Sequence, residues 1–331
     1  MPLVASVEPS KRLTLKILVI VAILVAVAVT KPQTDERSLY GSANEKRSED
    51  SSLGDKLDSL TNYVGILPQA RAPLIYSKQY LLLDATTSEI IVSEGADTPI
   101  PIASTTKMTT ALVASSLLSL DKVVTISSKP PTIQGSKIGL RPGEKITVRD
   151  LIFGLLIYSG NDAAFALAEA FSGIPGDYLQ FVQQMNKFAH VNHLLKTNYG
   201  DPAGLDDETG RSTPRELANV ARLLLQDPIL SKIVSTPETT VSSIDGQFTH
   251  TLKNTNRLIL PDNPYYLPNA LGVKTGFTLD AGHSLVAAYR WHDRILIGVV
   301  MNTTESTITA SATEMNKLFR WADRFLVLKQ Y

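Results

Sequence analysis

The 331-residue chain contains no cysteine, which excludes disulfides, thiol nucleophiles and cysteine-ligated metals. Its 32 basic and 32 acidic residues cancel, so it lacks the basic surplus that a general affinity for nucleic acid requires. Aromatic residues make up only 7% of the sequence, which offers no stacking platform for bases. Hydrophobic residues reach 44%, and this is enough to bury a sizeable core.

A long apolar run is found near the N-terminus. Lys11, Arg12 and Lys16 precede residues 17–29, which read ILVIVAILVAVAV. Thirteen residues suit the core of a signal peptide, whereas a membrane span needs roughly 20. We therefore expect 1–30 to be a basic N-terminus with a signal segment, or an uncleaved anchor if the run extends to Leu13. In both cases the bulk of the chain is exported.

Residues 31–70 are polar and highly charged, with few side chains to bury. This composition predicts a flexible tether, followed by a folded domain at 71–331. Leu53, Leu57, Leu60 and Val64 fall at helical spacing, which predicts a short amphipathic helix at the end of the tether.

Beyond residue 71, strand-length apolar runs occur at both ends and helix-length runs lie between them. The strand-like runs are 80–83, 90–92, 122–126, 271–274, 284–289 and 295–301, and the helix-like runs are 104–118, 148–158, 162–171 and about 307–326. Because the last strands follow one another too closely for crossover helices, we expect an α+β fold with a mostly antiparallel sheet. A further helix should start at Thr213, with Pro214 in the first position and Glu216 completing a capping box.

Three short motifs occur in order within this region. They are Ser104-Thr-Thr-Lys107, Ser159-Gly-Asn161 and Lys274-Thr-Gly276. The first two have second copies, at Ser119 to Lys122 and at Ser42 to Asn44. Ser42 lies in the predicted tether and Ser119 at the end of a predicted helix, whereas Ser104 heads a helix, where negative charge is stabilised. Position therefore favours the Ser104 copy.

A serine hydroxyl is a poor nucleophile unless a base removes its proton during attack. Lys107, about one turn from Ser104, is that base only if its pKa falls well below about 10.4. Burial and a second cation both lower a lysine pKa, and Lys274 is the expected second cation. The Ser159 hydroxyl would relay protons, and the Asn161 amide would hold Lys107 and a substrate carbonyl in register.

The segment after Lys274 suggests how a peptide would bind. Gly276 leaves one point of a strand without a side chain, so another backbone can approach closely and a peptide can add as a further strand. The backbone N–H groups of Ser104 and Phe277 are the expected oxyanion hole for a tetrahedral intermediate.

The ordered trio resembles the penicillin-recognising serine enzymes, for which these motifs are a known signature. Flanking sequence narrows the resemblance to the low-molecular-mass D-alanyl-D-alanine carboxypeptidases. The similar stretches cover most of the chain from about residue 75 to 300 and are 80–114, 135–173, 181–189, 201–207 and 271–288.

The resemblance implies a β-lactamase/transpeptidase-like fold, in which an antiparallel sheet covered by helices meets a helical subdomain and the active site lies between them. It implies that Ser104 is acylated, that Lys107 is the general base, and that Ser159 and Asn161 shape the cleft. Lys274 and Thr275 would hold the terminal carboxylate of the substrate, as a fixed cation and a hydroxyl can.

The implied reaction removes the terminal D-alanine from a peptidoglycan stem pentapeptide, and β-lactams would trap the same serine. The implied place is the outer face of the bacterial membrane, or secretion, with 71–331 as the catalytic domain and no metal or cofactor. Many relatives carry a second β-rich domain and a C-terminal anchor. This chain ends at Tyr331, so any membrane attachment is expected through the N-terminal segment.

Three alternatives stay open at this point. A D,D-endopeptidase would use the same trio, a β-lactamase would need fast hydrolysis of the acyl-enzyme, and a β-lactam sensor would be acylated without turnover. Among other residues, His190 and His193 could be read as a metal pair, but no third ligand accompanies them. Arg257 is expected either at the cleft or on plain surface, and residues 201–205 have the composition of a turn.

Overall fold

The computed structural model describes residues 62–206 and 208–330, which belong to a compact unit running from Asp58 to Tyr331. The predicted signal segment 1–30 and most of the predicted tether lie outside the described residues. None of the helices in the described part combines the length and the apolar character that crossing a bilayer requires.

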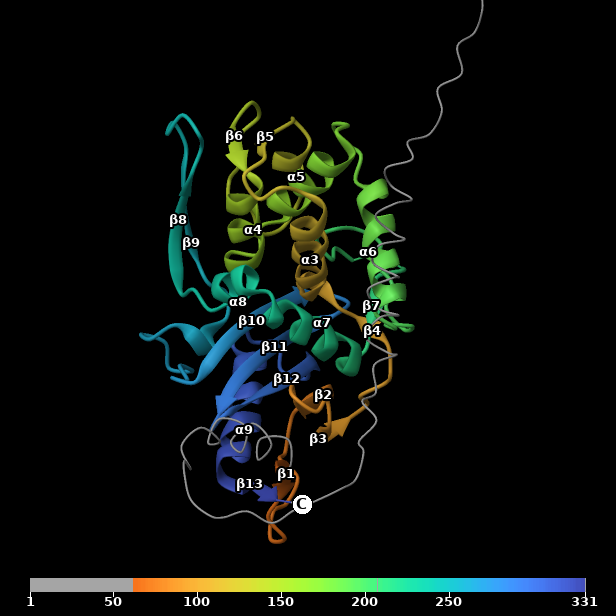
Figure 1. The fold of residues 1–331 in the computed structure, drawn as a ribbon, viewed down its shortest axis with the longest axis vertical. Coiled ribbons are helices and arrows are strands. Elements are labelled where there is room, and N and C mark those ends of the chain that lie inside the picture. The colour runs from red at the N-terminus through yellow and green to blue at the C-terminus, as the bar shows by residue number, and fades with distance from the viewer. Residues whose placement is uncertain (1–61, 207, 331) are drawn as a thin grey trace, which may run out of the picture. The chain divides into compact units, whose positions relative to one another are not determined.

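A five-stranded sheet lies at the centre of the unit, with strand order β10-β11-β12-β2-β3 (Figure 1). Every pair in it is antiparallel, which confirms the predicted α+β class. The strands are β2 Ser77–Asp84, β3 Ile90–Glu94, β10 Ala270–Thr278, β11 Gly282–Trp291 and β12 Arg294–Thr303. The hairpin β2–β3 and the later strands β10 to β12 thus share one sheet, and β10 lies at its edge.

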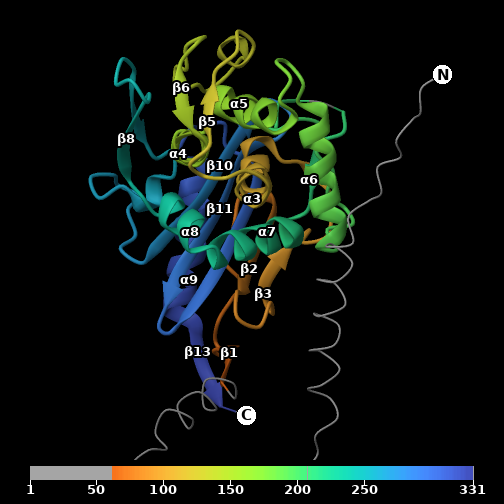
Figure 2. The same cartoon turned by 45° about the horizontal axis from the view of Figure 1, so that its top comes forward.

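Helices form a layer beyond the end of this sheet and cover both of its faces (Figures 1 and 2). They are α3 Lys107–Leu117, α4 Val148–Ile157, α5 Asn161–Ser172, α6 Leu179–Val191, α7 Pro214–Gln226, α8 Pro228–Val234 and α9 Ala310–Phe325. The helices α3 to α6 form the helical region, α7 and α8 pack on one face of the sheet, and α9 packs on β11 and β12. Because α9 and α7 bury different side chains of the same strands, we assign them to opposite faces.

Two apolar cores follow from the period-2 alternation of the strands. In β11, Val286 and Ala288 belong to the core shared with α3 to α8, whereas Leu285, Ala287 and Tyr289 belong to the core under α9. With both faces covered, these strands are apolar at nearly every position, as their sequences predicted. Fully burying a side chain such as Leu285 stabilises the fold by about 1.5–3 kcal/mol.

Smaller two-stranded sheets surround this framework. They are β1 Asn62–Ile66 with β13 Leu326–Gln330, β4 Ile100–Pro101 with β7 Arg211–Ser212, β5 Val123–Thr125 with β6 Lys145–Thr147, and β8 Glu238–Ser242 with β9 Thr249–Lys253. The hairpin β8–β9 lies beside α4 (Figure 1).

Two local predictions are corrected. Val64, predicted as part of an amphipathic helix, lies in β1, because this segment pairs with β13 instead of folding on itself. The Thr213 side chain does cap α7 by accepting from Glu216 N, but the reciprocal half of the capping box is wrong. The Glu216 carboxylate instead accepts from Lys196 N and the Thr197 hydroxyl, which lie beside it.

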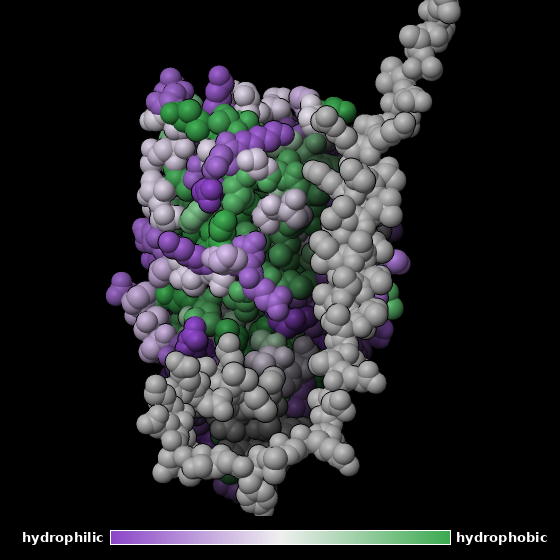
Figure 3. Space-filling view, in the orientation of Figure 1, coloured by the Kyte–Doolittle hydropathy of each residue, from purple (hydrophilic) through white to green (hydrophobic). Residues whose placement is uncertain are grey.

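The face of the molecule in Figure 3 shows apolar patches in its upper part, crossed by strips of polar residues. Some large apolar side chains in and around the helical region are exposed, including Leu117, Val123 and Ile174. Such scattered exposure is ordinary for a soluble domain surface.

Candidate active site

The first motif forms the junction of two helices. Ser104 lies in the short 3-10 helix η1 Ala103–Thr106, and Lys107 is the first residue of α3. The Lys107 Nζ and Ser104 Oγ atoms are 2.7 Å apart. Lys107 is 0% exposed, whereas Ser104 is half-buried and can be reached from outside. The predicted pairing of a hydroxyl with a buried amine is therefore present.

The Lys107 side chain is fixed by the turn that residues 201–205 form. Its Nζ also donates to the Ala203 carbonyl at 2.7 Å. That turn is fixed by the Asp201 carboxylate, which accepts from the backbone N–H groups of Ala203, Gly204 and Leu205. The turn chemistry of 201–205 was visible in the sequence, but its task of placing a carbonyl on the lysine was not.

Gly204 allows this turn to touch the nucleophile's helix. Its φ is +76°, and a Cβ built there would lie 1.9 Å from the Ala103 carbonyl oxygen and 2.6 Å from Thr106 Oγ1. A side chain at this position would collide with the backbone that precedes Ser104. Ala103 itself has φ +48°, a left-handed conformation that costs a non-glycine residue about 1 kcal/mol.

Burial lowers the pKa of Lys107 to about 7, while the carboxylates of Asp201 and Asp162 act in the opposite direction. A desolvated ammonium is disfavoured because the interior cannot replace its hydration. Near neutral pH a large share of Lys107 is therefore an uncharged amine, able to accept the Ser104 proton.

The third motif lies on the edge strand β10, directly against η1. Lys274 is 1% exposed, and its Nζ donates to the Thr275 carbonyl at 3.0 Å. Burial holds the pKa of Lys274 well below its ordinary value, and repulsion from Lys107 lowers it further. The sequence predicts that burial and a second cation together lower the pKa of Lys107, and burial is the main cause for both amines.

Gly276 is the point where β10 meets the nucleophile's segment. A Cβ there would lie 3.2 Å from the Ile102 carbonyl oxygen and 3.3 Å from Ala103 Cβ. The close backbone approach predicted at this glycine is present, but the approaching backbone is that of Ile102, just before η1. Next to it, the Thr275 and Thr255 hydroxyls are 2.6 Å apart, which orients Thr275.

The second motif connects α4 to α5. Ser159 is buried with φ +66°, and Asn161 is the first residue of α5. The Asn161 amide nitrogen donates to the Gln134 carbonyl at 2.6 Å. Within the described residues the Lys107 amine hydrogen-bonds to Ser104 and Ala203, and no direct hydrogen bond joins it to the Asn161 amide. The amide instead braces the loop that carries Ser136.

An open cleft of about 850 Å³ brings the motifs together. Ser104, Ser159, Thr275, Gly276 and Phe277 line it, and so does Arg257, which the sequence left between cleft and surface. Sequence reasoning missed other lining residues, among them Ser136 and His283, because neither stands in a chemical motif. Phe277 stacks on His283 with ring centroids 4.2 Å apart, so one rim of the cleft is aromatic.

Residues 68–305 match the model of the family described as D-alanyl-D-alanine carboxypeptidase. The chain belongs to this family.

Individual relatives agree with the family assignment. The chain is 31% identical over 268 residues to the D-alanyl-D-alanine carboxypeptidase DacC of Escherichia coli, covering 77% of this chain and 63% of that protein. It is 37% identical over 224 residues to a D-alanyl-D-alanine endopeptidase of Pseudomonas aeruginosa, covering 66% of this chain and 70% of that protein. The chain thus spans less than two thirds of the length of the E. coli carboxypeptidase.

Solved structures of similar proteins support the fold expected from the resemblance. The crystal structure of a Streptomyces DD-transpeptidase superposes with a TM-score of 0.69 at 29% identity, covering 76% of this chain and 98% of that one. The β-lactamase/transpeptidase-like architecture predicted from the motifs is therefore confirmed.

The second copy of Ser-x-x-Lys in this carboxypeptidase family member lies away from the cleft. Ser119 is exposed, and the Lys122 amine donates to the Ala170 carbonyl at 2.6 Å. His190 and His193 are also apart from the cleft. Among the residues that the structure describes, no cluster of three histidine, aspartate or glutamate side chains could hold a metal ion.

Proposed function

We propose that this family member is an exported serine D,D-carboxypeptidase that removes the terminal D-alanine from peptidoglycan stem pentapeptides. The observation that carries the proposal is the 2.7 Å contact between the half-buried Ser104 hydroxyl and the buried Lys107 amine, whose pKa of about 7 suits a general base. The relatives named as carboxypeptidases act on the D-alanyl-D-alanine bond and support the choice of substrate.

Acylation would begin when the substrate carbonyl lies against Ser104. The oxygen Oγ attacks the carbonyl carbon of the penultimate D-alanine while its proton passes to the uncharged Lys107 amine. The tetrahedral oxyanion is stabilised by the backbone N–H groups of Ser104 and Phe277. The C–N bond then breaks, D-alanine leaves with a proton supplied through Lys107 and Ser159, and an ester remains on Ser104.

Substrate binding and activation of the base would be coupled through charge. The terminal carboxylate of the peptide lies by Thr275 and Lys274, and Arg257 adds positive charge to the same cleft. A bound carboxylate favours the charged form of Lys274, which would in turn repel a proton from Lys107. The substrate therefore increases the share of Lys107 that is ready to act as the base.

The position of β10 at the edge of the sheet supports binding of an extended peptide. Such a peptide can add to an exposed strand edge through main-chain hydrogen bonds. The open end of the cleft leaves room for the rest of the stem, and water entering there would hydrolyse the ester on Ser104. A β-lactam would acylate the same serine because it carries a carboxylate and a reactive amide in similar positions.

The decisive experiment incubates the purified full-length chain with a stem pentapeptide ending in D-Ala-D-Ala and follows free D-alanine with time. Many turnovers per enzyme are the expected result. Cleavage of crosslinked dimers alone would make the chain an endopeptidase, as one relative at 37% identity is named. A stoichiometric burst followed by arrest would indicate a sensor, and rapid turnover of penicillin without peptide cleavage would indicate a β-lactamase.

The choice between the two Ser-x-x-Lys copies is tested by labelling with a fluorescent penicillin. We expect Ser104→Ala to abolish labelling, because the ester oxygen is removed. Ser119→Ala is the matched control and should label like the wild type, since Ser119 lies on the surface away from the cleft. Loss of labelling in the control variant with retention in Ser104→Ala would overturn the assignment.

For localisation we propose the outer face of the cell membrane or the space beyond it, where the peptidoglycan substrate lies. The support is sequence alone, namely the basic residues up to Lys16 and the apolar run 17–29. Fractionation of cells expressing the full chain and a variant lacking 17–29 tests this. The deletion should hold the protein in the cytoplasm, and unchanged export would contradict the proposal.

A further inference from the structure

One loop connects the candidate site to a part of the molecule that the chemistry above does not use. This loop, residues 133–140, carries Ser136 on the cleft. At its start, the Gln134 carbonyl accepts from the Asn161 amide and the Ser136 carbonyl accepts from Asn161 N at 2.7 Å. Further along, the buried Asp162 carboxylate accepts from the N–H groups of residues 138–140. Two adjacent residues of α5 thus hold the loop from one side.

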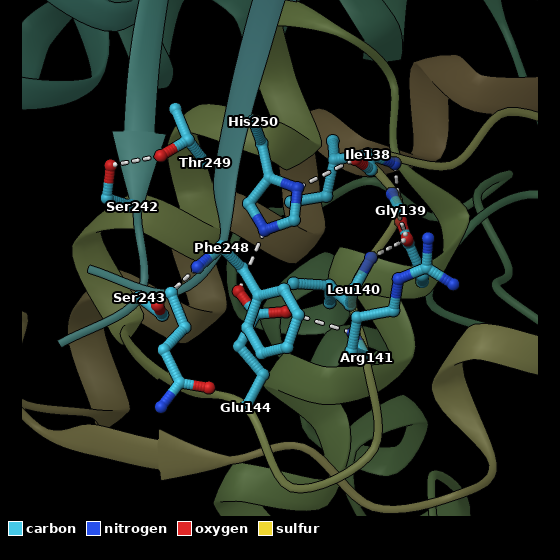
Figure 4. Close-up of polar contacts among 12 residues, drawn as sticks. Ile138, Gly139, Leu140, Arg141, Glu144, Ser242, Ser243, Phe248, Thr249 and His250 are labelled. Carbon is cyan, nitrogen blue, oxygen red and sulfur yellow. Dashed lines mark hydrogen bonds and ion pairs between the residues drawn. The ribbon is translucent and has the colours of Figure 1, made fainter. Parts of the chain in front are cut away.

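A buried histidine holds the same loop from the other side. His250 on β9 has Nδ1 3.0 Å from the Ile138 carbonyl oxygen and Nε2 2.8 Å from the Glu144 carboxylate (Figure 4). The two side chains are 6% and 0% exposed. The other Glu144 oxygen accepts from Arg141 N at 2.9 Å, so the carboxylate also closes the end of the loop.

The two contacts of His250 together require two hydrogens. A carbonyl oxygen can only accept, so Nδ1 of His250 must carry a hydrogen. The contact of 2.8 Å between Nε2 and Glu144 Oε1 then needs a second hydrogen, because a bare ring nitrogen and a carboxylate oxygen would otherwise face each other with lone pairs. Both contacts exist together only while the pair holds this additional proton, on the ring or on the carboxyl group.

We propose that His250 and Glu144 form a proton-dependent clasp that positions the loop 133–140 against Asn161 in the candidate active site. With the proton present, the hairpin β8–β9 is tied to the loop at Ile138 and the loop is held from both sides. When the proton leaves, one hydrogen remains for the two contacts. The bond to the Glu144 carboxylate is charge-assisted and therefore the stronger, so the contact with Ile138 is lost and the hairpin no longer holds the loop there. His250 is a positioning residue, since it acts through the loop and touches no reacting atom.

The other charged groups around the pair are either bound elsewhere or exposed to solvent. Asp162 at the start of α5 is committed to the backbone N–H groups of the same loop. Lys145 on β6 and Glu238 and Lys253 on the hairpin are exposed, so water screens their charges. In Figure 4 the Arg141 guanidinium points away from the ring, and only the backbone of this residue contacts Glu144.

The sharpest variant is Glu144→Gln. Its amide oxygen can accept from Arg141 N, and its NH₂ group can donate to Nε2 of a neutral His250 while Nδ1–H still donates to Ile138. This substitution keeps both contacts but removes their need for the additional proton. His250→Ala removes the clasp at every pH, and His190→Gln, at an exposed position on α6, controls for the loss of a histidine.

The readout is amide hydrogen exchange of peptides covering 134–141 in the full chain, corrected for intrinsic rates, between about pH 5 and 10. In the wild type and in His190→Gln we expect protection to fall by roughly tenfold or more as pH rises. Glu144→Gln should stay protected throughout, and His250→Ala should be unprotected throughout. Equal protection of wild type and Glu144→Gln at every pH would overturn the proposal, as would wild-type protection of the loop in a folded His250→Ala.

A second readout connects the clasp to the site and rests on the proposed function. We measure the rate of acylation by a fluorescent penicillin for the wild type and for Glu144→Gln at the same pH. The ratio of the wild-type rate to the Glu144→Gln rate should fall at high pH, in parallel with the protection of the loop. If no variant reacts with penicillin, the proposed function fails while hydrogen exchange still decides on the clasp. A constant ratio despite loss of protection would show that the loop does not serve the site.

Discussion

The pKa of about 7 for the buried Lys107 makes the rate of acylation depend on pH in a specific way. Only the uncharged amine can take the Ser104 proton, so the rate should follow the fraction of uncharged Lys107. With this pKa, about one tenth is uncharged at pH 6 and about nine tenths at pH 8. We therefore expect a rise of nearly tenfold between these values and a plateau above about pH 8.

The assay is the pseudo-first-order rate of labelling by a fluorescent penicillin in excess, read in a stopped-flow instrument at constant ionic strength. Asp201→Asn supplies an internal test, because the Asp201 carboxylate raises the pKa of Lys107. Its removal should shift the midpoint to lower pH, while the asparagine oxygen can still accept from the turn. A rate that is flat across this range, or a midpoint near the ordinary lysine value of about 10.4, would refute the reasoning.

Two further predictions concern stability. Because the folded pKa of Lys107 lies below its unfolded value, the unfolded state binds more protons between about pH 7 and 10 and stability rises with pH there. The unfolding free energy of the wild type minus that of Lys107→Met should therefore increase by up to about 1.4 kcal/mol for each pH unit in this window. Urea denaturation of both proteins measures this difference. A constant difference would contradict the burial argument. Gly204→Ala should lower the unfolding free energy several times more than Gly246→Ala, for which a loss of ~1 kcal/mol is expected. Gly204→Ala should also slow acylation. Both glycines have positive φ, +76° and +72°, but only Gly204 would bring a Cβ against backbone, so equal losses in thermal melts would refute the steric explanation.

Local sequence patterns predicted the elements of the fold well. The apolar runs at 80–83 and 284–289 lie in strands of the sheet, and Thr213 caps α7 as its sequence indicated. The helix predicted at Val64 was wrong because it, too, was inferred from a local pattern. Val64 has helical spacing with earlier leucines, but pairing with β13, which begins 262 residues after Val64 at Leu326, makes it a strand residue. Helical spacing cannot reveal a partner so far away along the chain.

The sequence by itself determined which residue types were available: a serine and a lysine one turn apart, a Lys-Thr-Gly strand, and enough apolar positions to enclose them. Only the tertiary structure decided their chemical state. Lys107 and Lys274 are far apart in the chain, and their lowered pKa values arise from burial, to which repulsion from Lys107 adds in the case of Lys274. The Gln134 carbonyl as the partner of Asn161, and His250 as that of Glu144, likewise follow from packing. The physical reason is that desolvation, charge and hydrogen bonding depend on distances in space, which residue order does not specify.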